Sequence, residues 1–185
     1  MFYYFGFGSN MSMLSLRAKG VEPRASTKAV LHGWQLRFNV QHFFRHEGGV
    51  GNIENTGHPD DRVLGVLHEC PDEALSLLDQ AEAYGHGYNR IEIEVEPDNP
   101  SAAMAPKVSA LTYVGMPQFI DNDCRPSRRY LNIVLEGGRQ AGLDGKYLES
   151  LANQPIHQLD EYPTFAAPPG DYPTFDRALL AKQPL

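Results

Sequence analysis

Short segments in which apolar and polar residues alternate recur along the chain, and this pattern limits the possible folds more than any other feature. A period of two is typical of half-buried strands, bounded here by Gly, Asn, Pro and Asp. We expect strands at residues 2–5, 27–40, 50–55, 62–70, 91–95 and 107–114. Several of them follow one another without an intervening helix, which favours a small sheet as the centre of the fold.

Helices are expected between and after these strands, at residues 11–18, 71–83, 130–140 and 144–151. Ser9 or Asn10 can cap the first helix. Pro71 suits the first position of the second, which should stop near Gly85, and Asp144 is a suitable cap for the last. Strands with helices inserted and appended indicate an α+β fold with a small closed sheet.

The length of 185 residues fits one domain with its own core. We assign that domain to residues 1–152. Residues 153–185 are rich in proline and aromatics, and Glu-Tyr-Pro-Thr-Phe at 161–165 recurs as Asp-Tyr-Pro-Thr-Phe at 171–175. We interpret this part as an irregular strap packed on the same domain, with partner binding as the alternative.

Composition excludes several kinds of partner. A net charge of −7 makes the nucleic-acid backbone a poor partner, and no run approaches the roughly 20 apolar residues of a membrane span. Cys70 and Cys124 have no CxxC spacing, which predicts free thiols rather than a disulfide or zinc site. The N-terminus lacks the features of a secretory signal, so the cytoplasm is the expected location.

Glu82 is the first candidate for chemistry. It follows Leu75 and Leu78 at spacings of three and four, so a carboxylate shares a helix stripe with apolar residues. Burial and the negative end of the helix dipole would both raise its pKa, as suits a general acid or base. The alternatives are that Glu82 is exposed where the helix frays, or that it pairs with Arg90.

The glycine-rich turn after the first strand is the second candidate. Gly6 and Gly8 permit unusual backbone angles and a close approach to a ligand. Successive N–H groups at Gly8, Ser9 and Asn10 could form a nest for a carboxylate or an oxyanion. A plain tight turn with a helix cap is the alternative.

Together these two motifs resemble the γ-glutamylcyclotransferase family. The resemblance is carried by Tyr-Phe-Gly-Phe-Gly-Ser-Asn-Met at 4–11 and Leu-Asp-Gln-Ala-Glu at 78–82, and continues through Gly85, Gly87, Tyr88 and Arg90. Pro-Ser-Arg-Arg-Tyr at 126–130, Gly-Leu at 142–143 and Tyr147 extend it over roughly residues 2–152.

The resemblance implies a small mixed β-barrel flanked by helices, with Glu82 as the acid/base. It also implies a substrate pocket formed by residues that match the family's motifs: Phe7, Gly8, Ser9, Asn10, Tyr88 and Tyr130. Gly-Ser-Asn in the loop, rather than Gly-Ser-Leu or Gly-Thr-Leu, favours γ-glutamyl amino acids as substrates. Two departures are Ala83, where the family often has glycine, and Phe7, where a tyrosine is frequent.

The implied reaction is cyclisation of a γ-glutamyl amide to 5-oxoproline. The substrate's own α-amine attacks the γ-carbonyl, so the enzyme needs to hold a folded-back conformer and move protons. We expect no cofactor and no metal, a small-molecule γ-glutamyl substrate as the only partner class, and a monomer or homodimer.

Other chemistries remain as alternatives. His42, His46 and Glu47 could bind a metal, although the flanking sequence predicts a strand and turn rather than a helix. Ser9 and Cys124 lack the setting of an activated nucleophile. A non-catalytic binding module on the same fold would have no reason to keep Glu82. A cyclotransferase that removes a γ-glutamyl protecting group from a biosynthetic intermediate is a further possibility.

Overall fold

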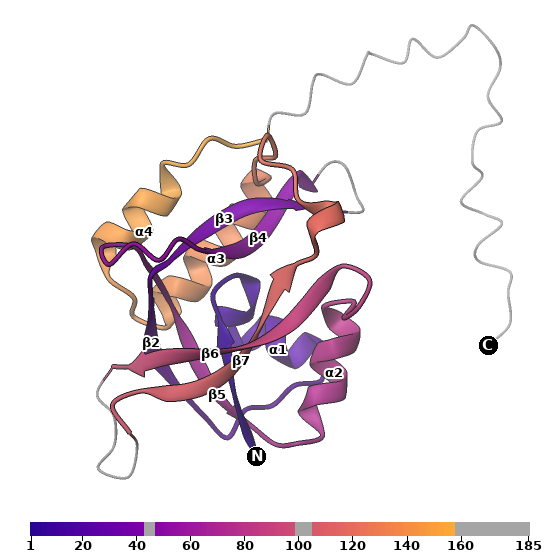
Figure 1. The fold of residues 1–185 in the computed structure, drawn as a ribbon, viewed down its shortest axis with the longest axis vertical. Helices are drawn as coiled ribbons and strands as arrows, with labels where there is room; N and C mark the ends of the chain where they lie inside the picture. The colour runs from indigo at the N-terminus through magenta and orange to yellow at the C-terminus, as the bar shows by residue number, and fades with distance from the viewer. Residues whose placement is uncertain (43–46, 99–104, 158–185) are drawn as a thin grey trace, which may run out of the picture.

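Five strands close into a barrel at the centre of the molecule (Figure 1). The computed structural model describes residues 1–42, 47–98 and 105–157. Neighbouring barrel strands pair antiparallel, except that β1 and β7 close the barrel in parallel at Tyr4 and Leu111. Around the barrel the order is β1 (Phe2–Gly6), β5 (Arg62–Cys70), β2 (Ala25–His32), β6 (Tyr88–Pro97) and β7 (Val108–Gly115).

A second sheet of two antiparallel strands lies against the barrel and consists of β3 (Trp34–Gln41) and β4 (Gly49–Asn55). The stretch expected as strand over 27–40 therefore contains two strands that belong to different sheets. Gly33 separates them with a φ of 78°, a left-handed conformation that favours glycine. The small mixed barrel and the α+β class expected from the sequence are confirmed.

In the described ranges four α-helices flank the two sheets, with α3 and α4 beside the β3–β4 sheet and α1 and α2 on another side of the barrel (Figure 1). Asp144 caps α4 as expected, because its side chain accepts a hydrogen bond from the Tyr147 N–H at 2.9 Å. Ser127 caps α3 in the same way through the Tyr130 N–H. The bounds are α1 (Met13–Ala18), α2 (Ala74–Ala81), α3 (Arg128–Gln140) and α4 (Gly145–Ala152).

The first two helices begin later than the sequence predicted. Residues Ser9–Met11 form a 3₁₀ helix, and α1 follows Ser12 rather than Ser9 or Asn10, neither of which caps it. Pro71 precedes a turn instead of opening α2, which starts three residues later. The predicted cap of α1 fails because the Asn10 side chain hydrogen-bonds to other side chains.

Three buried clusters hold these layers together. The barrel interior contains Phe5 and Phe7, and a second cluster joins α3 and α4 to the β3–β4 sheet. The third cluster joins α1 and α2 to the barrel through Leu16, Leu78 and Tyr113. Each helix therefore packs by its apolar face, and this packing fixes the position of the polar residues at the end of that face.

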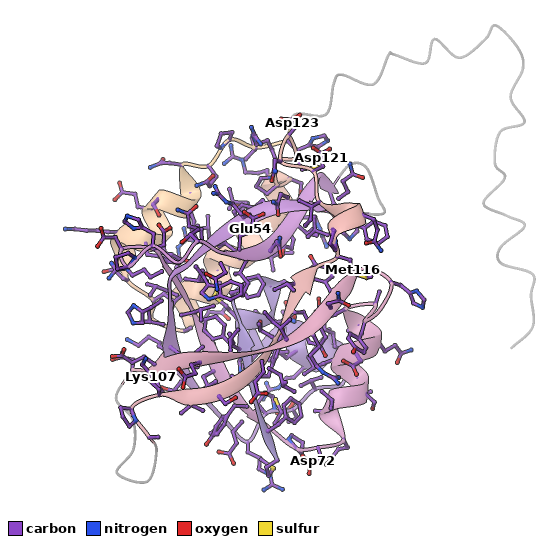
Figure 2. The ribbon with its side chains drawn as sticks, in the orientation of Figure 1. Glu54, Asp72, Lys107, Met116, Asp121 and Asp123 are labelled. Atoms are coloured by element: carbon purple, nitrogen blue, oxygen red, sulfur yellow. The ribbon has the colours of Figure 1, made fainter. Side chains whose placement is uncertain are left out.

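Charged side chains cover both ends of the described structure. Figure 2 shows Glu54, Asp121 and Asp123 at the end near the β3–β4 sheet, and Asp72 near the N-terminus.

Cys70 is buried, Cys124 is half-buried, and both are free thiols. Within the described ranges no helix has the length and apolarity to cross a membrane. The strap expected at 153–185 lies outside the described residues from 158 onward.

Candidate active site

A cavity of about 210 Å³ brings together most of the predicted site residues. Glu82 contributes from the end of α2, Ser9 from the 3₁₀ helix, Tyr88 from the start of β6 and Tyr130 from α3. This volume lies below the roughly 300–1,000 Å³ of drug-sized pockets, so it suits a group of amino-acid size. The remaining lining residues are Lys19, Val40, Gln41, His42, Val50, Ala81, Ala83, Gly87 and Phe119.

A larger cavity of about 510 Å³ lies between the β3–β4 sheet and residues 122–126. Its lining includes Arg37, Asn39, Glu54 and Cys124, and none of the predicted site residues. We therefore place the chemistry in the smaller cavity, where titratable and hydrogen-bonding groups from several elements converge.

Glu82 lies at the C-terminal end of α2, one turn after the fully buried Leu78. Its side chain is 16% exposed. Its Oε1 atom accepts hydrogen bonds from Asn10 Nδ2 at 2.9 Å and from Lys19 Nζ at 3.0 Å. Among the described residues no donor lies within hydrogen-bond distance of Oε2. One carboxylate oxygen is thus anchored while the other is left for a ligand.

The alternative pairing of Glu82 with Arg90 is wrong. Arg90 instead forms a salt bridge with Asp79, with Nη1 at 2.7 Å from Oδ1. Tyr113 donates a second hydrogen bond to the same Asp79 oxygen at 2.6 Å. Asp79 therefore fastens α2 to β6 and β7 and holds the helix end that carries Glu82.

Asn10 has a different place from the one expected of a substrate-binding side chain. Both hydrogens of its amide are used, on Glu82 and on the Tyr4 hydroxyl at 2.6 Å, and its Oδ1 accepts from Lys19 at 2.5 Å. Its backbone carbonyl accepts from His68 Nε2 at 3.0 Å. Asn10 thus positions the carboxylate and does not line the cavity.

His68 is fully buried beneath this loop. Since Nε2 donates to the Asn10 carbonyl, Nδ1 accepts from the Ser26 hydroxyl at 2.8 Å, which sets the neutral tautomer. Burial lowers the pKa of His68 to about 4, although the bond to Asn10 opposes that shift. Neutral His68 therefore holds the loop from below at ordinary pH.

Two tyrosines on the far side of the cavity hold the backbone N–H and carbonyl groups of Gly51 on β4. The Gly51 N–H donates to the Tyr130 hydroxyl at 3.0 Å, and the Tyr88 hydroxyl donates to the Gly51 carbonyl at 2.9 Å. Burial raises the pKa of Tyr130 to about 12, and the nearby Glu82 charge acts in the same direction. Burial likewise raises the pKa of Tyr88 well above its usual value. Both phenols therefore stay protonated and can donate hydrogen bonds.

The glycines of the first loop allow close packing, and Gly8 also has backbone angles outside the helical and extended regions. Gly8 has a φ of −114° and a ψ of −134°, so its unusual conformation does not involve a positive φ. A Cβ at Gly8 would lie 3.1 Å from the Tyr130 hydroxyl, and one at Gly6 would lie 2.9 Å from the Asn10 carbonyl oxygen. Ser9 beside the Tyr130 hydroxyl acts against the burial that raises the pKa of this phenol.

The remaining sequence candidates lie around or away from the cavity. Phe7 is buried in the barrel core, and neither it nor Gly8 lines the cavity. His42 lines it, whereas His46 lies outside the described residues. In the described part of the chain, no three His, Cys, Asp or Glu side chains form a group suited to a metal ion.

Sequence reasoning missed Lys19, Tyr4, His68 and Gly51. Three glycines in the segment 48–51 were an available signal for the last, because glycine in a strand often marks a close approach of other groups. No local pattern distinguished Lys19 from an ordinary solvent-exposed lysine at a helix end.

Comparisons with known proteins agree with this fold. The AIG2-like family matches residues 62–151. The gamma-glutamyl cyclotransferase aclK of Aspergillus oryzae is 25% identical over 171 residues, which cover 84% of this chain and 62% of that protein. The gamma-glutamylcyclotransferase of Mus musculus is 28% identical over 154 residues, which cover 81% of this chain and 77% of that protein.

A solved structure of a gamma-glutamyl cyclotransferase superposes with a TM-score of 0.73 at 22% identity, covering 86% of this chain and 90% of the other. At that identity the superposition bears on the fold alone. The sequence matches span most of this chain and, in the Aspergillus protein, less than two thirds of the relative. Over most of its length the chain is thus similar in sequence to two proteins named as γ-glutamylcyclotransferases, and its barrel with flanking helices matches the fold of a third.

Proposed function

We propose that this protein is a γ-glutamylcyclotransferase that converts a γ-glutamyl amide into 5-oxoproline and a free amine or amino acid. The observation that carries the proposal is the Glu82 carboxylate in a small cavity, with Oε1 held by Asn10 and Lys19 and Oε2 without a donor among the described residues. A carboxylate held by one oxygen can exchange a proton at the other without moving.

In the proposed mechanism, Glu82 Oε2 removes a proton from the substrate's α-ammonium group. The freed amine attacks the γ-carbonyl carbon, a new C–N bond closes the five-membered ring, and a tetrahedral oxyanion forms. Glu82 then gives this proton to the leaving nitrogen as the old C–N bond breaks. The ring nitrogen loses its second proton, which passes through the same carboxylate to the released amine, so the products are a neutral lactam and an ammonium group. No water is consumed, and one carboxylate serves both nitrogens.

The Tyr130 hydroxyl is the donor we assign to the oxyanion. It accepts from the Gly51 N–H and lies beside Ser9, so its oxygen is fixed while its proton remains available. A neutral phenol held in this way can stabilise a developing negative charge without reorganising. Val40, Val50 and Phe119 form the apolar part of the lining and are suited to the leaving group.

The test is Glu82→Gln with γ-glutamyl-alanine as substrate and 5-oxoproline as the measured product. The amide can still accept the hydrogen bonds of Asn10 and Lys19 but cannot carry the proton, so kcat should fall by roughly 10²- to 10⁴-fold with the fold retained. The matched control is Glu73→Gln, an exposed residue at the other end of α2, which should change kcat by less than about twofold. A Glu82→Gln variant within about tenfold of the parent would remove the assignment.

A further inference from the structure

The polar end of the cavity contains an ion pair formed by two helix ends. Lys19 follows α1, Glu82 follows α2, and their charged atoms lie 3.0 Å apart with side chains 24% and 16% exposed. Removing two charges from water is costly, and a general acid/base does not itself require a neighbouring cation. The position of Lys19 in the lining therefore suggests a role toward a ligand.

The hydrogen bonds of Lys19 leave capacity for such a ligand. An ammonium group carries three donors, and two are directed at Asn10 Oδ1 and Glu82 Oε1. In the ranges that the structure describes, the third has no protein acceptor. The cation thus lines the cavity with one donor available.

The backbone N–H groups of the first loop carry only partial charges. Those of Met11 and Ser12 bond to carbonyl groups within the loop, at 3.1 Å each. Lys19 is therefore the strongest anion-binding group at this end of the cavity, because it carries a full charge.

A γ-glutamyl group carries an ammonium and a carboxylate on the same α-carbon. We propose, on the basis of the function proposed above, that Lys19 binds the α-carboxylate while Glu82 receives the α-ammonium. The substrate zwitterion then matches the Lys19–Glu82 pair charge for charge, and each protein group exchanges part of its present contact for an opposite charge on the ligand. Lys19 is in this view a specificity-determining residue for γ-glutamyl compounds.

The experiment compares two substrates that differ only in the α-carboxylate. The first is γ-glutamyl-alanine, and the second is γ-aminobutyryl-alanine, which is followed as a substrate or, if turnover is too slow, as a competitive inhibitor. Lys19→Met keeps the apolar stem and should lower kcat/KM for the first by about 10- to 100-fold, mainly through KM. For the second, kcat/KM or the inhibition constant should change by less than about threefold.

Two further variants serve as controls. Lys19→Arg keeps the charge and should retain most of the kcat/KM for γ-glutamyl-alanine that Lys19→Met loses. Lys28→Met removes a lysine that pairs with Asp98 outside the cavity and should leave both compounds unaffected. If Lys19 acted only by positioning Glu82, Lys19→Met would lower kcat/KM or weaken inhibition equally for both compounds, and that result would overturn the proposal. An unchanged KM for γ-glutamyl-alanine would overturn it as well.

Failure of the proposed cyclotransferase function can be distinguished from failure of the proposed role of Lys19. If the parent protein releases no 5-oxoproline, γ-glutamyl-alanine becomes a stable ligand whose binding can be measured by calorimetry. Weaker binding of the dipeptide to Lys19→Met, with no change for γ-aminobutyryl-alanine, supports Lys19 as the carboxylate-binding residue without any turnover. Equal binding of the dipeptide to the parent and the variant overturns it.

Discussion

At the scale of single residues, Asn10 connects the loop motif with the helix motif. Its side chain contacts Glu82, Lys19 and Tyr4, and its carbonyl group contacts His68. A side-chain amide whose donors and acceptor are all engaged adds rigidity rather than a free ligand contact. The Gly-Ser-Asn motif therefore acts here partly by orienting the carboxylate.

The pH dependence of stability should reveal His68. Its pKa is lowered to about 4 in the folded protein, against about 6.5 for an exposed histidine, so the unfolded chain binds more protons between these values. Stability from this group should be complete above about pH 6.5, fall as pH falls toward 4, and lose about 3 kcal/mol in total.

Urea unfolding of the parent and of His68→Gln at pH 7 and pH 4 measures this effect, because glutamine does not titrate. The difference in free energy of unfolding between the two proteins should shift against the parent by about 3 kcal/mol on acidification. A difference that stays constant between the two pH values would contradict a neutral buried histidine.

At the scale of elements, the end of α2 determines where the carboxylate lies. The helix stops at Ala81, Glu82 is its C-cap, and Ala83 turns the chain away with a φ of 48°. This is the left-handed conformation in which glycine is usual, and it is the position at which the family often has glycine. The departure noted in the sequence therefore falls on a strained backbone position.

Ala83→Gly should relieve that strain. The left-handed conformation costs about 1–2 kcal/mol in a residue with a Cβ, and the greater entropy of an unfolded glycine offsets part of the gain. We expect the free energy of unfolding to rise by up to about 1 kcal/mol, measured as an increase in the urea midpoint.

The converse change, Gly142→Ala, provides the comparison. Gly142 has a φ of 71°, and a Cβ there would meet no atom within 4 Å, so only the backbone conformation would be penalised. It should lower stability by about 1 kcal/mol. If Ala83→Gly lowered stability as much as Gly142→Ala, the idea of strain at the end of α2 would be wrong.

At the scale of the whole molecule, the candidate active site lies where the barrel meets the β3–β4 sheet. Glu82, Lys19 and Tyr88 come from the barrel side, whereas Val40 and Val50 come from the smaller sheet. The cavity therefore exists only if the two sheets keep their relative position.

Asn52 is one of the groups that hold the sheets together. Its buried side chain accepts from the Gly115 N–H on β7 at 2.9 Å and donates to Asn39 Oδ1 on β3 at 3.1 Å. Asn52→Ala leaves both partners without this contact, so the free energy of unfolding should fall by about 1–3 kcal/mol. Because the cavity spans both sheets, KM for γ-glutamyl-alanine should rise as well.

Thr56→Ala is the matched control, since Thr56 bonds to Gly33 and Asp61 at the exposed end of the smaller sheet. It should affect stability by about 0.5 kcal/mol or less and leave KM unchanged. Loss of stability in Asn52→Ala without any change in KM would mean that this contact does not maintain the cavity.

Local patterns determined the elements themselves. Alternation predicted the strands, Asp144 predicted the start of α4, and the spacing of Leu78 and Glu82 placed the carboxylate one turn beyond a buried face. These predictions succeed because the spacing of apolar residues along a segment indicates which face of that helix or strand is buried. The two motifs indicated a similarity to γ-glutamylcyclotransferases and, through it, the small mixed barrel flanked by helices.

Only the tertiary structure decided which groups meet. Asn10 and Lys19 contact Glu82 across 72 and 63 residues of sequence, and Gly51 meets Tyr130 across 79. Periodicity carries no information on what lies opposite a face, because that depends on how separate elements pack in the closed barrel and against the second sheet. The position of the Glu82 carboxylate could thus be predicted from its own helix, whereas the position of Lys19 beside it depends on how α1 and α2 pack on the barrel.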